Sequence, residues 1–307
     1  MSRWAFIFVV LAACGKPSSE MATPDAGPMD AAAPDAAISC VPLGECAWLD
    51  AYERHIVAAL SGVEMVVPGT TLTQRASVAA RDATRTFLIT EFAALGLQAA
   101  RQDYTSGNYV GANIVATLEP TADAGGTIIL GAHFDTVPTS PGAADDGTGV
   151  AVVLAAARYL RELPVRHHRV VFALFDQEEL GLIGSREYVK TLTGVSIRGA
   201  HIFDMLSFDG DGDHVVELWS PSPALAAAYQ AQAAAAGAPV SPVTFSSSDH
   251  EAFLEAGLVA TGVSEEFVGG DHTLTYHDPS DTYANVQFEY LARATRLALA
   301  VLDADVR

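Results

Sequence analysis

Residues 127–149 read TIILGAHFDTVPTSPGAADDGTG, and this stretch carries the strongest clue to the fold. The β-branched and apolar run over 127–131 predicts a strand. The loop that follows holds one histidine and three acidic residues, His133, Asp135, Asp145 and Asp146. Acidic residues and glycines are common in solvated turns. Open α/β sheets, however, bind ligands at the carboxyl ends of their strands, so the loop is also a candidate metal site, and the rest of the chain has to decide.

Helical and strand-like patterns alternate on both sides of this stretch. Apolar residues at helical spacing predict helices over 48–61, 72–95, 149–163, 180–191, 224–236, 250–256 and 286–303. Further strands are predicted over 114–118, 169–175, 200–205 and 215–219. The segment 169–175, RVVFALF, is continuously apolar, as in strands buried on both faces. This alternation predicts an α/β fold, a three-layer sandwich in which helices flank a largely parallel mixed central sheet.

Composition narrows the choice of partner. The 307 residues include 17 basic and 37 acidic side chains, for a formal charge of −20. Nucleic-acid binding needs clustered Lys and Arg, so no nucleic acid is expected as a partner. An acidic surface attracts cationic ligands such as free peptide amines, over the roughly 10 Å that salt screening allows.

The chain begins with the pattern of an export signal. Arg3 precedes an apolar run, and residues 1–13 are predicted to be a signal peptide. The stretch LAAC ending at Cys14 resembles the lipobox of bacterial lipoproteins, which implies lipidation of the Cys14 thiol and a membrane anchor. The alternative is an ordinary cleaved signal. We therefore expect an exported protein, lipid-anchored at the bacterial cell envelope, in the periplasm or at the outer membrane.

The next residues do not look folded. Residues 14–39 are mostly Pro, Ala, Asp and Ser without periodicity, which predicts a disordered tether ahead of a folded domain over 40–307. Cys40 and Cys46 lie at the start of that domain. In an exported protein they are expected to form a disulfide, with two free thiols as the alternative.

Three further candidate sites follow, two of them where other predicted strands end. The strand 169–175 runs into Glu178 and Glu179, and the strand 200–205 contains Asp204 near its end. His277 lies in the late stretch YHDPSDT. Taken singly, each has an ordinary explanation: a charged helix start, a strand-end cap, and a surface histidine in a turn.

Together, however, the series HFD, GAADDGTG, DQEELGLIGS, FDM and YHDPSDT resembles the zinc-dependent aminopeptidases that include bacterial leucyl aminopeptidase and aminopeptidase Y, with glutamate carboxypeptidase II as a relative. The resemblance covers roughly residues 105–290. It implies two zinc ions per chain, one held by His133, Asp145 and Asp204 and the other by Asp145, Glu179 and His277.

The resemblance also implies roles around the two ions. Glu178 would be the general base, and Asp135 would accept the other ring N–H of His133. The peptide bond between Asp145 and Asp146 would be cis. The chemistry of the donors agrees, because zinc accepts imidazole nitrogen and carboxylate oxygen. Three carboxylates and a hydroxide also balance the charge of two zinc ions, which a buried site requires.

The implied activity is that of an exopeptidase that hydrolyses the N-terminal peptide bond of peptides with a free N-terminus, through a dizinc-bridged hydroxide. We expect a monomer. His250 is a candidate for lining the substrate pocket, although a helix N-cap explains the neighbouring Ser248 and Asp249 equally well. The stretch DGDGD over 209–213 does not match a calcium loop and is predicted to be a turn.

Two other functions stay open at this point. A glutaminyl-peptide cyclase of the same fold would bind a single zinc ion. An inert surface-binding module on a peptidase fold would bind a partner without catalysis. Such degenerate relatives lose metal ligands, whereas this chain has the full ligand set and the base.

Overall fold

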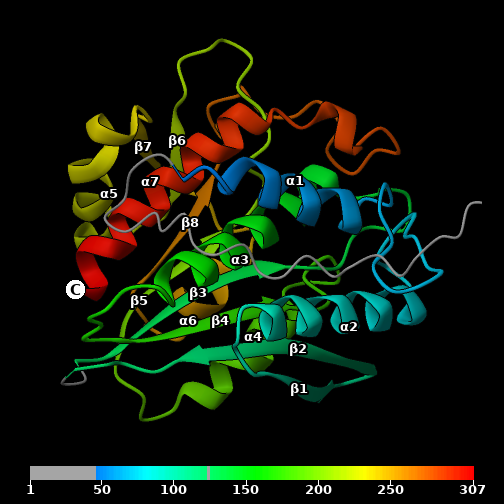
Figure 1. The fold of residues 1–307 in the computed structure, drawn as a ribbon, viewed down its shortest axis with the longest axis horizontal. Coiled ribbons are helices and arrows are strands. Elements are labelled where there is room, and N and C mark those ends of the chain that lie inside the picture. Colours follow the sequence, from blue (N-terminus) through cyan, green and yellow to red (C-terminus); the bar gives the residue numbers. More distant parts are fainter. Residues whose placement is uncertain (1–45, 123–124) are drawn as a thin grey trace, which may run out of the picture. The chain divides into compact units, whose positions relative to one another are not determined.

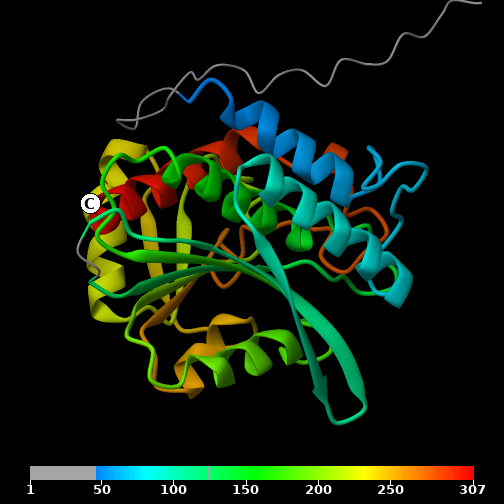
Figure 2. The same ribbon diagram turned by 60° about the horizontal axis from the view of Figure 1, so that its bottom comes forward.

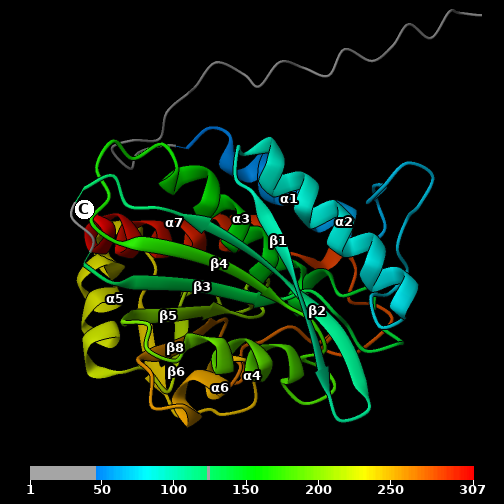
Figure 3. The same ribbon diagram turned by 90° about the horizontal axis from the view of Figure 1, so that it is seen from below.

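The computed structural model describes residues 46–122 and 125–307. Within that part the strands form one eight-stranded mixed sheet, in the order β1-β2-β4-β3-β5-β8-β6-β7 (Figure 3). The strands are β1 (Ala99–Ser106), β2 (Tyr109–Leu118), β3 (Thr127–His133), β4 (Arg169–Phe175), β5 (Ile197–Phe203), β6 (Val216–Trp219), β7 (Val240–Val243) and β8 (Ala260–Ser264).

The middle of the sheet is parallel. β4, β3, β5 and β8 pair with one another in parallel, whereas β1, β2 and β6 join by antiparallel pairing. Every residue of β3 and β8 is buried, as expected for strands that are covered on both faces. The carboxyl ends of the four parallel strands therefore meet at one edge of the sheet.

Helices cover both faces of the sheet. They are α1 (Leu49–Leu60), α2 (Val78–Ala94), α3 (Gly149–Leu160), α4 (Ile183–Val189), α5 (Pro223–Ala236), α6 (His250–Glu255) and α7 (Phe288–Val306). Figures 1 and 2 show α1, α2, α3 and α7 on one face and the shorter α4 and α6 on the other. Two apolar clusters fill the two interfaces, the larger one around α3 and the smaller one around Phe175, Tyr188 and Phe253. The predicted three-layer α/β sandwich is confirmed.

The sequence patterns do not predict the strands β1, β7 and β8. The edge strand β1 is largely polar, β7 has only four residues and contains Pro242, and β8 (ATGVS) is short and built mostly of small residues although it lies in the buried middle of the sheet. The predicted helix over 72–95 is too long at its start. α2 begins at Val78 because Ser77 is extended and its side chain accepts a hydrogen bond from the Ala80 amide.

Predictions about the start of the chain lie outside the described residues. These are the signal peptide 1–13, the tether 14–39, the lipidation of Cys14 and the state of Cys40. Cys46 is disulfide-bonded, and its pairing with Cys40 stays a prediction. Among the helices of the described segments, none is long and apolar enough to span a membrane.

Candidate metal centre

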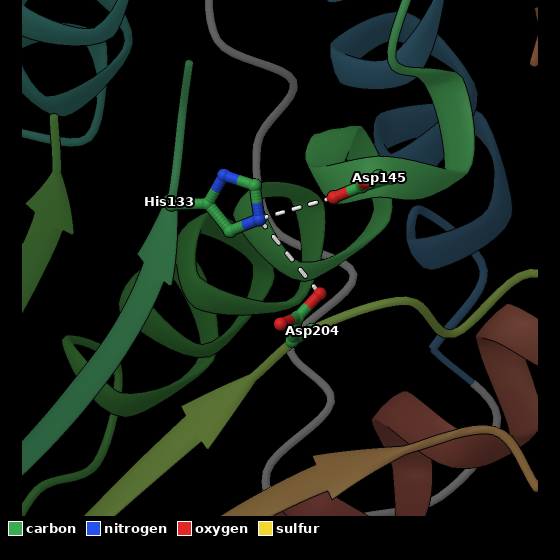
Figure 4. Close-up of side chains that lie close together, drawn as sticks. All are labelled: His133, Asp145 and Asp204. Atoms are coloured by element: carbon green, nitrogen blue, oxygen red, sulfur yellow. Dashed lines mark ion pairs between the residues drawn. The ribbon is translucent and has the colours of Figure 1, made fainter. Parts of the chain in front are cut away.

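The predicted ligands converge at the carboxyl edge of the parallel strands. His133 is the last residue of β3, Asp204 follows β5, and Asp145 comes from the turn 143–148 that leads into α3. Figure 4 shows the three side chains pointing toward one another. The Nε2 atom of His133 lies 3.1 Å from Oδ1 of Asp145 and 3.8 Å from Oδ1 of Asp204. All three residues are buried.

A second group shares Asp145. Nε2 of His277 lies 3.2 Å from the other carboxylate oxygen of Asp145, Oδ2, and 3.0 Å from Oε2 of Glu179. Glu179 follows β4, and His277 stands in the loop ahead of α7. In each group the potential ligand atoms lie within 4.8 Å of one another. Asp145 thus offers one oxygen to each group, as a bridging ligand does.

The chemistry of these groups fits two divalent cations. Each combines one imidazole nitrogen with two carboxylates, a donor set that suits zinc. Oδ1 of Asp204 is buried and has no hydrogen-bond partner in the described part of the chain, so a cation would satisfy an atom that is otherwise costly to bury. Burial raises the pKa of Glu179 to about 7, and the nearby Asp145 carboxylate adds to the rise. A cation would relieve this crowding of negative charge.

Asp146 ties the ligand-bearing segments together. Its carboxylate accepts hydrogen bonds from the backbone amides of His133, Gly149 and Met205, at 3.2, 2.8 and 3.2 Å. These amides belong to the end of β3, the start of α3 and the residue after Asp204. A Cβ atom at Gly149 would lie only 2.4 Å from Asp146, so this position requires glycine. The Asp145–Asp146 peptide bond is cis, as the family resemblance implied.

Asp281 joins the last ligand loop to the same turn. Its buried carboxylate accepts hydrogen bonds from the backbone amides of Ala144 and Asp145, at 2.8 and 3.2 Å. It lies four residues after His277. The segment that carries His277 is thereby held against the turn that carries the shared carboxylate.

Asp135 and Glu178 lie next to the two groups. Oδ1 of Asp135 is 3.5 Å from Nδ1 of His133, and the same carboxylate accepts hydrogen bonds from the amides of Glu178 and Glu179. Asp135 therefore holds the backbone of the glutamate pair beside the histidine ring, whose Nδ1 atom makes no hydrogen bond within the described residues. Burial raises the pKa of Glu178 well above its ordinary range, and Asp249 adds to the rise. Glu178 belongs to neither ligand group.

A cavity beside the ligands has an aromatic wall. Glu178, Asp204 and His277 line it together with Trp219, Phe245, Phe267 and Tyr276. The ring of Tyr276 stacks on that of His277 with 3.8 Å between centroids. Trp219 and Phe245 pack at 4.4 Å, and Phe267 contacts both. Tyr276 belongs to the stretch YHDPSDT, whereas Trp219, Phe245 and Phe267 come from a strand end and loops far apart in the sequence, and no motif points to these three rings.

His250, predicted to line the pocket, lies one layer behind it. Its Nε2 atom is 2.9 Å from the carbonyl oxygen of Phe245, and its ring packs 5.8 Å from that of Trp219. The cavity lining does not include it. The alternative explanation as a helix cap also fails for Asp249, because that side chain makes no cap hydrogen bond with α6.

The acidic segment 209–213 forms a turn. Within it the carboxylate of Asp209 accepts a hydrogen bond from the backbone amide of Gly212, and Asp271, from the loop after β8, accepts hydrogen bonds from the amides of Gly210 and Asp211. The turn that the sequence predicts between two strands is therefore present.

Comparisons with known proteins agree with the geometry. A model of peptidase family M28 matches residues 113–302. The probable lipoprotein aminopeptidase LpqL of Mycobacterium tuberculosis is 30% identical over 223 residues, which cover 63% of this chain and 44% of that protein. The structure of BSAP, a zinc aminopeptidase from Bacillus subtilis, is similar with a TM-score of 0.61 at 28% identity, over 66% of this chain and 52% of that one.

The fold is also that of another enzyme class. Porphyromonas gingivalis glutaminyl cyclase matches with a TM-score of 0.69 at 19% identity, over 84% of this chain and 98% of that one. At this identity the likeness shows the fold alone. The chain spans only 40% to 44% of the length of the first curated relatives that it matches.

Proposed function

The chain belongs to peptidase family M28, and from this membership together with its site we propose that it is a metal-dependent aminopeptidase that holds two zinc ions. The observation that carries the proposal is the pair of ligand groups that share Asp145. One ion is held by His133, Asp145 and Asp204, and the other by Asp145, Glu179 and His277. Curated relatives named as aminopeptidases support the activity.

The ions and the protein have separate tasks in this proposal. Bound zinc supplies Lewis-acid chemistry, polarising the scissile carbonyl and lowering the pKa of a water molecule. Glu178 takes the proton of the attacking water as general base and later gives it to the leaving amine. Its raised pKa suits a group that must hold a proton between two steps. Asp135 keeps the backbone of Glu178 in place.

The surroundings of the site support a peptide substrate with a free N-terminus. Asp135 and Glu178 belong to neither ligand group, so they add negative charge that the ions do not balance, and this charge favours a positively charged amine over a blocked one. The aromatic wall of Trp219, Phe245 and Phe267 offers an apolar surface for the side chain of the first residue. Apolar side chains gain free energy from burial against such a surface, so we expect them to be preferred.

The experiment is a panel of aminoacyl p-nitroanilides, each assayed with and without a chelator. The proposal predicts release of nitroaniline from substrates with a free α-amine, no release from their N-acetylated forms, and loss of activity on chelation. Glutaminyl peptides belong in the same panel. Cyclisation of the glutaminyl peptides without hydrolysis of the nitroanilides would favour the hypothesis of a glutaminyl cyclase. A protein that converts none of these substrates would favour a binding module.

The location is also a proposal. We propose that residues 1–13 are removed as a signal peptide, that Cys14 carries the lipid, and that 14–39 tether a domain over 40–307 at the cell envelope. The word lipoprotein in the name of the mycobacterial relative supports this. Cys40 and Cys46 close the start of the domain as a disulfide, and the enzyme acts as a monomer.

A further inference from the structure

A buried arginine lies behind the ligand-bearing turn. Arg75 belongs to the loop ahead of α2, and it is fully buried. No ion pair among the described residues includes it. Its guanidinium instead donates to four backbone carbonyls: Phe134 at 2.6 Å, Leu60 at 2.8 Å, Pro141 at 2.8 Å and Gly142 at 2.9 Å.

Two of these four carbonyls lie next to segments that carry metal ligands. Phe134 directly follows His133, and Gly142 directly precedes the turn 143–148 that contains Asp145. The backbone amide of Arg75 also donates to the hydroxyl of Thr136, between those two segments. One side chain therefore fastens both ends of the loop that joins two ligands of the same ion, and anchors it to Leu60 at the end of α1.

The space around the guanidinium leaves little freedom. A Cβ atom at Gly142 would lie 2.7 Å from Nη2 of Arg75 and 2.2 Å from a methyl carbon of Thr136. The backbone of Gly142 also has a positive φ of 71°, which favours glycine. A side chain larger than glycine at position 142 would therefore collide with Arg75 and Thr136.

Charge gives a second reason for an arginine here. Burial lowers the pKa of Arg75, whereas the carboxylates of Asp281 and Asp145 raise it. The guanidinium is the least readily deprotonated side chain, and its planar fork can serve several carbonyls at once. It places a permanent positive charge behind a crowded group of carboxylates. Before metal binds, this charge reduces the repulsion among them.

We propose that Arg75 is a positioning residue that presets the His133–Asp145 loop for metal binding. This inference rests on the proposed metal site. Arg75 touches neither the ions nor the substrate, so its effect is on metal affinity and on the geometry of the shared carboxylate. Residues that hold ligands in place typically change metal affinity by ~10–100-fold when they are replaced.

The test compares zinc affinity in three variants of the full chain, measured by competition with a chromogenic chelator. Arg75→Met removes the charge and the fork, and it is expected to bind zinc ~10–100-fold more weakly than the wild type. Arg75→Lys keeps the charge but has fewer donors, and it is expected to fall between the two. Thermal unfolding of each metal-free protein reports stability separately.

Arg166→Met is the matched control. Arg166 is also buried and donates to backbone carbonyls, those of Leu163 and Leu160 among them, close to where α3 ends and ahead of β4. Its loss is expected to lower the unfolding temperature and to leave zinc affinity unchanged. If it weakens zinc binding as much as Arg75→Met does, the effect is general destabilisation and the proposal is wrong.

Two further outcomes are decisive. Wild-type zinc affinity in a folded Arg75→Met protein would overturn the proposal. If that variant does not fold, Arg75→Lys decides: weakened binding supports the role and unchanged binding refutes it. Failure of the wild type itself to bind zinc would count against the metal site, which is a different result from any of these.

Discussion

Glu53 offers a quantitative test of how the helical layer beside the site is packed. It lies on α1, fully buried against α7, where Oε1 accepts a hydrogen bond from the hydroxyl of Thr295 and Oε2 has no partner. Burial raises its pKa from the ordinary 4.5 to about 8. The carboxyl is therefore neutral in the folded protein over a pH range in which it is ionised in the unfolded chain.

The direction in which stability changes with pH follows from the number of protons that the folded and unfolded states bind. Between pH 4.5 and about 8 the folded state holds a proton that the unfolded state has lost, so stability falls as the pH rises. The stability that the neutral Glu53 carboxyl contributes is fully present below the pKa of the unfolded state. It is lost as the pH rises through the pKa of the folded state. From these two values the loss of stability between pH 5 and pH 8 is about 3–4 kcal/mol.

Glu53→Gln cannot titrate and should not show this loss. We expect the stability of the variant, relative to the wild type, to rise by about 3–4 kcal/mol between pH 5 and pH 8. Urea unfolding followed by circular dichroism at each pH measures the difference. Glu289→Gln is the control, because that side chain on α7 is 91% exposed. A difference between Glu53→Gln and the wild type that stays constant or shrinks with pH would refute the reasoning.

Other predictions concern the site and the anchor. Glu178→Gln should keep both metal ions and lose ~10²–10⁴-fold in turnover; near-normal turnover would remove the general-base assignment. Glu179→Gln should retain one ion fewer by elemental analysis, and an unchanged count would show that it is no ligand. Phe267→Ala should lower kcat/KM for a leucyl substrate roughly tenfold more than for an alanyl one, whereas equal losses would argue against the aromatic pocket. Cys14→Ser should release the protein from the membrane fraction, and continued attachment would contradict lipidation.

The sequence brings the candidate ligands together for a physical reason. His133, Glu179 and Asp204 each stand at or just past the end of a predicted strand, and the carboxyl ends of parallel strands meet at one edge. Local patterns and strand topology are therefore enough to bring them together. The strand β8 is harder to predict, because it has only five residues, of which Ala260 and Gly262 have low strand propensity, and it is recognised only by its neighbours in the sheet.

The parts of the site that the sequence does not predict depend on long-range contacts. Arg75 looks like any surface arginine in the stretch LTQRAS, and its partners are backbone carbonyls that carry no residue signal. The aromatic wall joins Trp219, Phe245 and Phe267 across two loops. His250 packs against the Trp219 ring, a contact between segments distant in the sequence that no local pattern predicts.

The most direct test of the account is to count zinc against activity in one series of samples. Metal-free protein is loaded with increasing zinc, freed of unbound ion, and divided between elemental analysis and hydrolysis of a peptide with a free N-terminus. The account predicts binding that saturates at two zinc ions per chain, together with release of the N-terminal amino acid. Saturation at one ion, or two bound ions without any release, would contradict it.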